Sequence, residues 1–147
     1  MEVDGSEPSS NCFTGNCFCE NVQVKIDGEP QTASYCHCSN CRRLSGAPFT
    51  AQAVFRSPSV EVNVVDGSLQ EFNSSKDVIR KRCPKCFSPV VASLFKGKLS
   101  AVPLSLFPWK EGLVPEALKP QHHIYYAQRL MDIDDGLPKY EARHNGK

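Results

Sequence analysis

Hydrophobic and polar residues alternate along much of the chain, which is the pattern of strands with one buried face. The clearest example is the run from Val22 through Val24 to Ile26, in which polar residues occupy the positions between. Two apolar runs flank Lys96-Gly97-Lys98, and this arrangement predicts a hairpin. The strands predicted in this way cover residues 22–26, 49–55, 60–64, 69–72, 88–95, 99–104 and 123–127.

Little of the sequence has the period of a helix. Eleven Pro and nine Gly interrupt the chain, and only residues 109–118 indicate a helical turn, which Pro115 ends. The predicted fold class is therefore mainly β. No repeat or linker divides the chain, so we expect a single domain over residues 12–142. It would lie between a disordered, polar leader at 1–11 and a tail at 143–147.

Composition and charge exclude several classes of function. The 147 residues include 17 Lys and Arg against 16 Asp and Glu, a net charge of +1 that disfavours a nucleic-acid binder. No apolar run approaches the roughly 20 residues that cross a bilayer. The N-terminal residues are acidic and polar, unlike a signal peptide. We therefore expect a cytoplasmic protein without nucleic-acid or membrane partners, in which the eight cysteines stay reduced.

Seven of the eight cysteines fall into three short groups, two pairs and a triple group. Structural zinc takes four protein ligands, whereas catalytic zinc commonly takes three and keeps one position open. The seven thiols divide as four plus three, because the triple group suffices for an open site whereas each pair needs the other. A single zinc ribbon with spare thiols is the alternative. The division assigns Cys17, Cys19, Cys83 and Cys86 to a closed zinc site, and Cys36, Cys38 and Cys41 to an open one.

A more specific pattern surrounds these cysteines. In order, the chain contains Thr14-Gly-Asn-Cys-Phe-Cys19, Tyr35-Cys-His-Cys-Ser-Asn-Cys-Arg-Arg-Leu-Ser-Gly-Ala-Pro-Phe49 and Arg82-Cys-Pro-Lys-Cys-Phe-Ser-Pro89, then His123-Ile-Tyr125 and Asp135-Gly-Leu-Pro-Lys-Tyr-Glu141. Together these segments resemble the glutathione-dependent formaldehyde-activating enzyme family, with domains of the centromere protein V and S-(hydroxymethyl)glutathione synthase type. The resemblance spans nearly the whole expected domain.

The resemblance implies a fold, a cofactor and an activity. The fold is the β-tent zinc-binding fold, as in methionine sulfoxide reductase B and Rab-associated zinc proteins. The cofactor is zinc, about two ions per chain, with Cys36, Cys38 and Cys41 as catalytic residues. The activity is that of a carbon–sulfur lyase that joins or cleaves an adduct of glutathione, or a related thiol, with a small aldehyde such as formaldehyde. A non-catalytic zinc-binding interaction module of the same fold is the alternative.

Two positions beside the closed site depart from the family pattern. Glu20 follows the first Cys-x-Cys and Phe87 follows the Cys-x-x-Cys, where the family usually has Gly. Gly in such places serves a backbone turn that other residues enter at a cost. We therefore expect a changed loop backbone at these two positions.

Arg42 and Arg43 directly follow the last cysteine of the triple group. One of them is a candidate for binding a carboxylate of glutathione, for which the arginine fork is suited. The alternative is that both are solvated loop charges. A second basic run, Arg80-Lys81-Arg82, is interpreted as a solvated strand face.

The remaining candidates are a cysteine and three histidines. Cys12 is interpreted as a bystander. Alternation along an extended chain turns His37 away from the cysteines on either side of it, which argues against a ligand role. The same alternation sends His122 and His123 to opposite faces of a strand, and contact of one of them with the substrate is a hypothesis.

Overall fold

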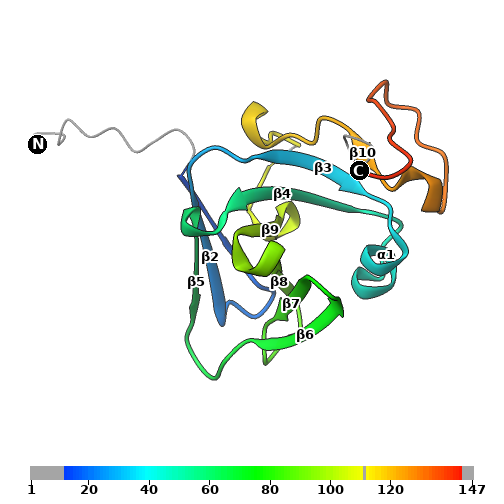
Figure 1. The fold of residues 1–147 in the computed structure, drawn as a ribbon. Coiled ribbons are helices and arrows are strands. Elements are labelled where there is room, and N and C mark those ends of the chain that lie inside the picture. The colour runs from blue at the N-terminus through cyan, green and yellow to red at the C-terminus, as the bar shows by residue number, and fades with distance from the viewer. Residues whose placement is uncertain (1–11, 111, 144–147) are drawn as a thin grey trace, which may run out of the picture.

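The computed structural model describes residues 12–110 and 112–143. The predicted leader at 1–11 lies outside the described residues, as does the part of the predicted tail at 144–147. Two β-sheets dominate the described part (Figure 1). The mainly β prediction is confirmed, and two sheets that carry clusters of cysteines form the expected β-tent zinc-binding fold.

The smaller sheet has three antiparallel strands in the order β1 (Cys12–Asn16), β2 (Val22–Asp27) and β5 (Val60–Val64). On the central strand β2, the side chains of Val22, Val24 and Ile26 have no solvent exposure, whereas the residues between them are exposed. One buried face is thus the cause of the alternation in the sequence.

The larger sheet has seven strands, and their order brings distant parts of the chain together. Each neighbouring pair is antiparallel except the edge pair β10 and β3, which is parallel. In sheet order the strands are β10 (His123–Ile124), β3 (Thr32–Cys36), β4 (Thr50–Arg56), β9 (Leu99–Pro103), β8 (Pro89–Leu94), β7 (Val78–Arg82) and β6 (Gln70–Ser75).

Helical structure is confined to short segments. Within the described ranges, α1 (Ser39–Ser45) is the one α-helix. It ends at Gly46, whose φ of 70° allows its N–H to reach the carbonyl oxygen of Arg42. No helix among the described residues is long and apolar enough to cross a membrane. The 3₁₀ turns are η1 (Ser57–Ser59), η2 (Phe95–Gly97), η3 (Leu104–Leu106), η4 (Glu116–Leu118) and η5 (Tyr126–Gln128).

Two predicted elements are shorter in the structure than in the sequence-based expectation. Among the described residues between 109 and 118, only the turn η4 is helical, and it begins directly after Pro115. Of residues 123–127, only His123 and Ile124 pair as a strand. Tyr125 then adopts a φ of 52°, which turns the chain out of the sheet.

The hydrophobic core contains residues from both sheets and holds them together. Its largest members without solvent exposure include Ile26 of β2, Phe55 of β4 and Val102 of β9. At Gly15 of β1, an added Cβ would lie 2.8 Å from the carbonyl oxygen of Leu106. This close approach of two backbones requires glycine.

The fold places α1 at one end of the long strands β3 and β4 (Figure 1). The C-terminal segment, which contains β10, lies at the same end, because β10 pairs with β3. The triple cysteine group and the C-terminal segment of the resemblance therefore lie at the same end of the fold.

Candidate metal centres and the adjoining cleft

The first cluster of cysteines joins the turn between β1 and β2 to the turn between β7 and β8. The Sγ atoms of Cys17, Cys19, Cys83 and Cys86 all lie within 4.8 Å of one another. Cys19 Sγ lies 3.7 Å from the Sγ atoms of both Cys17 and Cys83. Four sulfurs bound at about 2.3 Å around one tetrahedral zinc ion are about 3.8 Å apart. The cluster thus has the size and the donors of a closed zinc site.

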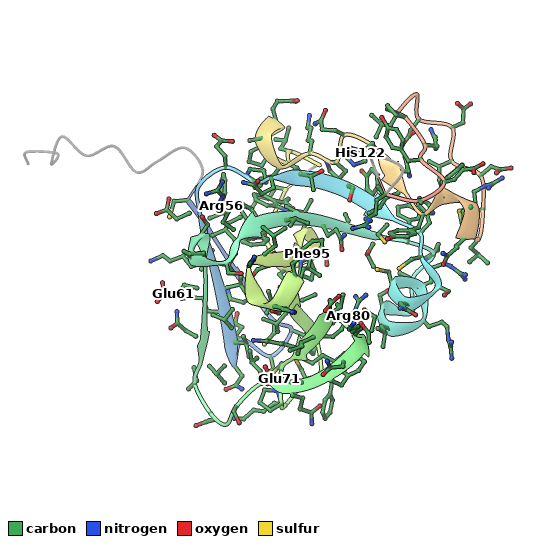
Figure 2. The ribbon with its side chains drawn as sticks, in the orientation of Figure 1. Arg56, Glu61, Glu71, Arg80, Phe95 and His122 are labelled. Carbon is green, nitrogen blue, oxygen red and sulfur yellow. The ribbon has the colours of Figure 1, made fainter. Side chains whose placement is uncertain are left out.

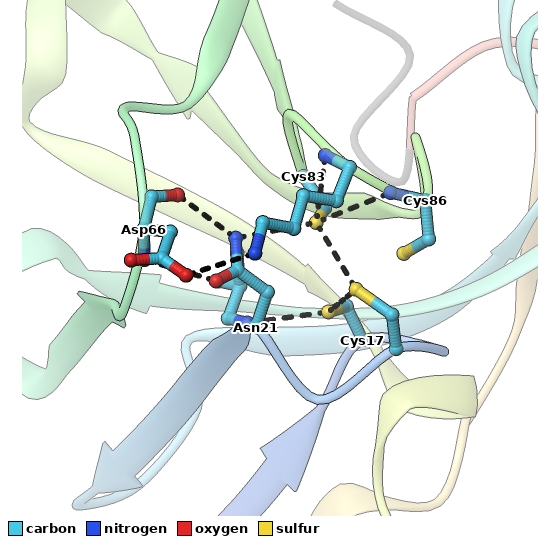
Figure 3. A network of polar contacts seen from close by, with 8 residues as sticks. Cys17, Asn21, Asp66, Cys83 and Cys86 are labelled. Atoms are coloured by element: carbon cyan, nitrogen blue, oxygen red, sulfur yellow. Dashed lines mark hydrogen bonds and ion pairs between the residues drawn. The ribbon is translucent and has the colours of Figure 1, made fainter.

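Amide groups surround the buried sulfurs of this cluster (Figure 3). Val22 N–H donates to Cys17 Sγ at 3.2 Å, and the N–H groups of Lys85 and Cys86 donate to Cys83 Sγ at 3.4 and 3.5 Å. Hydrogen bonds of this kind favour the thiolate, which is the form that binds a metal. Although burial opposes ionisation, the amide hydrogen bonds lower the pKa of the Cys83 thiol.

Asn21 supports the same cluster from the side (Figure 3). Its Nδ2 lies 3.9 Å from Cys83 Sγ and donates to the carbonyl oxygen of Asp66 at 3.0 Å. Its Oδ1 accepts from the N–H of Asp66 at 2.9 Å. The two hydrogen bonds with the Asp66 backbone hold the amide of Asn21 in one orientation, with its donor group toward the sulfur.

Glu20 and Phe87 both adopt the left-handed conformation, with φ of 65° and 62°. Glu20 N–H donates to the Cys17 carbonyl and Phe87 N–H donates to the Cys83 carbonyl, each at 3.1 Å. Both turns therefore have the backbone conformation that glycine favours, although neither residue is glycine. Both loops therefore keep the backbone turn that glycine would make, and the expected change of the loop backbone is absent at these two positions. The effect of having Glu20 and Phe87 in place of glycine is conformational strain at the two residues.

Replacing either strained residue with glycine is expected to stabilise the protein. Relief of the left-handed conformation of a residue with a Cβ amounts to about 1 kcal/mol. We expect Glu20→Gly and Phe87→Gly each to raise the free energy of unfolding by about that amount, measured by denaturant titration with saturating zinc. Glu20→Ala is the matched control, because it keeps a Cβ at the same φ and gains nothing. A less stable Glu20→Gly variant would contradict the assignment of strain.

The second cluster lies where β3 leads into α1. Cys36 is the last residue of β3, Cys38 is the N-cap of α1, and Cys41 lies in its first turn. Cys41 Sγ lies 3.4 Å from Cys36 Sγ, and Cys41 N–H donates to Cys38 Sγ at 3.2 Å. The three Sγ atoms all lie within 4.8 Å of one another. This cluster has the three soft donors of an open zinc site.

Arg80 of β7 places its guanidinium against this second cluster (Figure 2). Its Nη1 and Nη2 lie 3.9 and 3.8 Å from Cys41 Sγ, while its Nε donates to Ser74 Oγ at 2.9 Å. The neighbouring thiols of Cys36 and Cys38, together with this guanidinium, lower the pKa of Cys41 strongly against the effect of burial. Hydrogen bonding to Cys38 and Cys41, together with burial, raises the pKa of the Cys36 thiol.

A cleft of about 550 Å³ extends from the second cluster toward the first. Cys41 forms part of its wall, and Phe18, from the turn that carries the first cysteine pair, forms another part. All three members of the basic run 80–82 line it. The interpretation of this run as a solvated strand face is wrong for Arg80 and Arg82, whose guanidinium groups contact Cys41 Sγ and backbone carbonyl oxygens. Lys81, by contrast, is partly exposed and pairs with Glu71.

The other candidates from the sequence lie outside this cleft wall. Arg42 directs its Nε to the carbonyl oxygen of His37 at 3.3 Å, and Arg43 is exposed. Neither is among the residues that line the cleft. Cys12 is exposed on β1 and belongs to neither cluster.

The histidines follow the predicted alternation. The ring of His122 contacts the ring of Tyr140, whereas the ring of His123 points to His37, with Nδ1 of His123 2.8 Å from Nε2 of His37. His37 thus turns to another histidine and is not part of the cysteine cluster.

Sequence reasoning missed Arg80 as a neighbour of the open cluster. The signal available in the sequence was spacing. Arg80 and Arg82 are two residues apart on the strand that leads into Cys83, so their side chains lie on the same face of that strand. Nothing in the sequence indicates that this face meets α1.

The comparisons with known proteins agree with this geometry. A family model described as glutathione-dependent formaldehyde-activating enzyme matches residues 12–128. A crystal structure of a Rhodobacter sphaeroides protein has a similar fold, with a TM-score of 0.52 and 20% sequence identity, covering 86% of this chain and 98% of that chain. A search of curated proteins yields no match.

The family match includes all the clustered cysteines and most of the fold. Because it covers well over half of the sequence, the chain belongs to the glutathione-dependent formaldehyde-activating enzyme family.

Proposed function

We propose that the protein is a zinc-dependent carbon–sulfur lyase that joins glutathione, or a related thiol, to a small aldehyde such as formaldehyde. In the joining direction, the thiol sulfur forms a bond to the carbonyl carbon, the carbon–oxygen double bond becomes a single bond, and the thiol proton ends on the oxygen. The reverse reaction cleaves the adduct. The observation that carries the proposal is a three-cysteine cluster of which one member, Cys41, lines a basic cleft.

We propose that Cys36, Cys38 and Cys41 hold the catalytic zinc ion, and that the other four clustered cysteines hold a structural one. The donor sets fit these roles, because three close thiols suit an open zinc site and four suit a closed one. An open zinc site supplies a position at which a substrate thiol binds as its nucleophilic thiolate. We also propose a cytoplasmic location, where a reducing environment keeps clustered thiols available to zinc.

Three thiolates leave the open centre negatively charged, so a fourth thiolate needs a positive group nearby. Arg80 supplies it, since its guanidinium contacts Cys41 Sγ and also lines the cleft. Lys81 and Arg82 line the same cleft, although Lys81 pairs with Glu71 at 3.2 Å and Arg82 donates to two backbone carbonyls.

We assign the glutathione carboxylate contact to Arg80 and its neighbours on β7 in preference to Arg42 and Arg43. The reason is position, since both of the latter lie outside the cleft wall. Burial of a carboxylate in this cleft requires a charged donor beside it, and an arginine fork can donate two parallel hydrogen bonds.

Calorimetry with the zinc-loaded protein tests this function. We expect glutathione to bind at least ten times more tightly than S-methylglutathione, because the methyl group blocks the thiol. Arg80→Ala is expected to weaken glutathione binding about tenfold or more, which corresponds to about 1.4 kcal/mol. The double variant Arg42→Ala with Arg43→Ala is the control and is expected to bind within about twofold of the unsubstituted protein.

Equal affinity for glutathione and S-methylglutathione would mean that the thiol does not reach the open centre. The non-catalytic zinc-binding module would then replace the lyase as the better description. Weaker binding in the Arg42 and Arg43 double variant, with no effect of Arg80→Ala, would return the carboxylate contact to α1.

A further inference from the structure

Three side chains from separate parts of the chain form a hydrogen-bonded series behind the open cluster. Nε2 of His123 lies 2.6 Å from Oδ2 of Asp135, and Nδ1 of His123 lies 2.8 Å from Nε2 of His37. Both imidazole rings have no solvent exposure. Burying two polar rings in this way is costly unless each has a partner. The burial of these two histidines therefore indicates a role beyond filling the core.

The ionised end of the series sets the direction of its hydrogen bonds. Asp135 Oδ1 accepts from Lys139 Nζ at 2.6 Å and from Leu137 N–H at 3.1 Å. Burial opposes ionisation of Asp135, but these hydrogen bonds and that with His123 hold the pKa of its carboxyl well below the usual range. With a carboxylate at one end, His123 donates from Nε2 and accepts at Nδ1. His37 therefore donates from Nε2.

The inner end of the series is held by its surroundings and not by a further hydrogen bond. Among the described residues, Nδ1 of His37 has no hydrogen-bond partner. The ring of His37 stacks on Phe49 with centroids 4.9 Å apart, and the edge contact with Tyr126 has centroids 5.1 Å apart. The orientation of the His37 ring thus depends on one hydrogen bond, to His123, together with these two aromatic contacts.

His37 lies between Cys36 and Cys38 in the sequence, so a shift of its backbone also shifts these two cysteines. The main chain around it is also held by the C-terminal segment. His37 N–H donates to the carbonyl oxygen of Ile124 at 3.1 Å, and Ile124 pairs with Cys36 across β10 and β3. Ser39 N–H donates to Gln128 Oε1 at 2.8 Å. The C-terminal segment therefore holds both neighbours of Cys38, His37 and Ser39, in place.

We propose that His123 and Asp135 are positioning residues for the open metal centre, acting through His37 to fix the separation of Cys36 and Cys38. The inference rests on the proposed function, since it takes this cluster as the catalytic zinc site. According to this inference, the C-terminal segment that carries His123 and Asp135 affects zinc binding at the open centre only. The closed centre has no residue in the series and serves as an internal reference.

Zinc competition with a chromophoric chelator tests the inference in the full-length protein. We expect Asp135→Ala to weaken zinc binding at the open centre by about tenfold, the lower end of the effect of losing a direct partner of a metal ligand, because Asp135 acts through two histidines. Zinc affinity at the closed centre is expected to stay within twofold. Cobalt substitution supplies a spectroscopic readout, in which the visible bands of the open centre change and those of the closed centre do not.

Asp132→Ala is the matched control. Asp132 lies in the same loop and pairs with Arg129 at 2.6 Å, but its side chain is 84% exposed and contacts neither histidine of the series. We expect its two zinc affinities to equal those of the unsubstituted protein. If Asp135→Ala fails to fold, Asp135→Asn decides the question, because it keeps the size of the side chain but removes the charge that fixes the direction of the hydrogen bonds in the series. A selective loss of affinity at the open centre is again the expected result.

The possible failures are distinguishable. An unsubstituted protein that binds zinc at only the closed centre would overturn the proposed function. An unsubstituted protein with two centres, together with an Asp135 variant that keeps both affinities, would overturn the positioning role alone. Equal weakening of both centres would also overturn it, because the effect would then be one on general stability.

Discussion

Cys83→Ser is expected to leave the protein unfolded or insoluble. Cys83 has no solvent exposure, and its sulfur accepts from the amides of Lys85 and Cys86 in the cluster that joins two distant turns. A structural zinc site contributes about 10–16 kcal/mol in small zinc domains, as much as the entire net stability of a typical domain, about 5–15 kcal/mol. Circular dichroism, solubility and zinc content of the purified variant measure the effect.

Cys12→Ser is the matched control for this experiment. Cys12 is exposed and lies outside both clusters, so its replacement is expected to change neither the fold nor the zinc content. A Cys83→Ser variant that melts at the same temperature as the unsubstituted protein would show that the four-cysteine cluster does not stabilise the fold.

Cys38→Ser is expected to have the opposite effect, with the fold retained and the activity lost. The closed cluster is intact in this variant, so we expect the zinc content to fall from about two ions per chain to about one. Lyase activity with glutathione and formaldehyde should fall by at least about a hundredfold, since changes to the partners of metal ligands alone cost about 10–100-fold. Elemental analysis and the initial rate of adduct formation are the two measurements.

The contrast between the two cysteine variants decides the division of the clusters. If Cys38→Ser and Cys83→Ser behaved alike, the assignment of one catalytic and one structural centre would be wrong. One zinc ion per unsubstituted chain, with a freely alkylated triple group, would instead indicate the single zinc ribbon.

Strands that have one face on the core and one in solvent are predictable from this sequence. β2 and β5 belong to this class, because their alternate residues are buried or partly buried while the others are exposed. The predicted hairpin around Lys96 is present as β8 and β9, which pair antiparallel. Alternation in the sequence matches alternation of burial in β2 and β5, whereas the hairpin was indicated by two apolar runs around a short turn.

The strand β3 and the helix α1 were not predicted, because contacts with distant segments determine which of their residues are buried. β3 has a buried pair, Ala33 and Ser34, in adjacent positions, so no alternation marks it. α1 is only seven residues long and buries one residue, Cys41. A helix of this length has no apolar stripe to detect, and its limits are set by the cap at Cys38 and by Gly46.

The candidate site likewise has a part that the sequence predicts and a part that it does not. The cysteine groups were visible because the ligands within each group are neighbours in sequence, and the structure brings together both predicted sets. Arg80 and Cys41 meet only because β7 faces α1, and their contact spans a sequence separation of 39 residues. His37 and His123 are separated by 86 residues. Such contacts depend on the tertiary arrangement, which local spacing does not encode.

The sequence positions of the clustered cysteines have a consequence for the order of events on the ribosome. Chains emerge from the N-terminus, and domains fold as their parts become available. All three thiols of the open cluster lie within residues 36–41, whereas the closed cluster needs residues 83–86 as well as 17–19. The ligands of the open centre are therefore complete while the nascent chain still lacks the second half of the closed one. Asp135 emerges after the ligands of both clusters, so the full set of contacts around the open centre forms only once both ligand sets are complete.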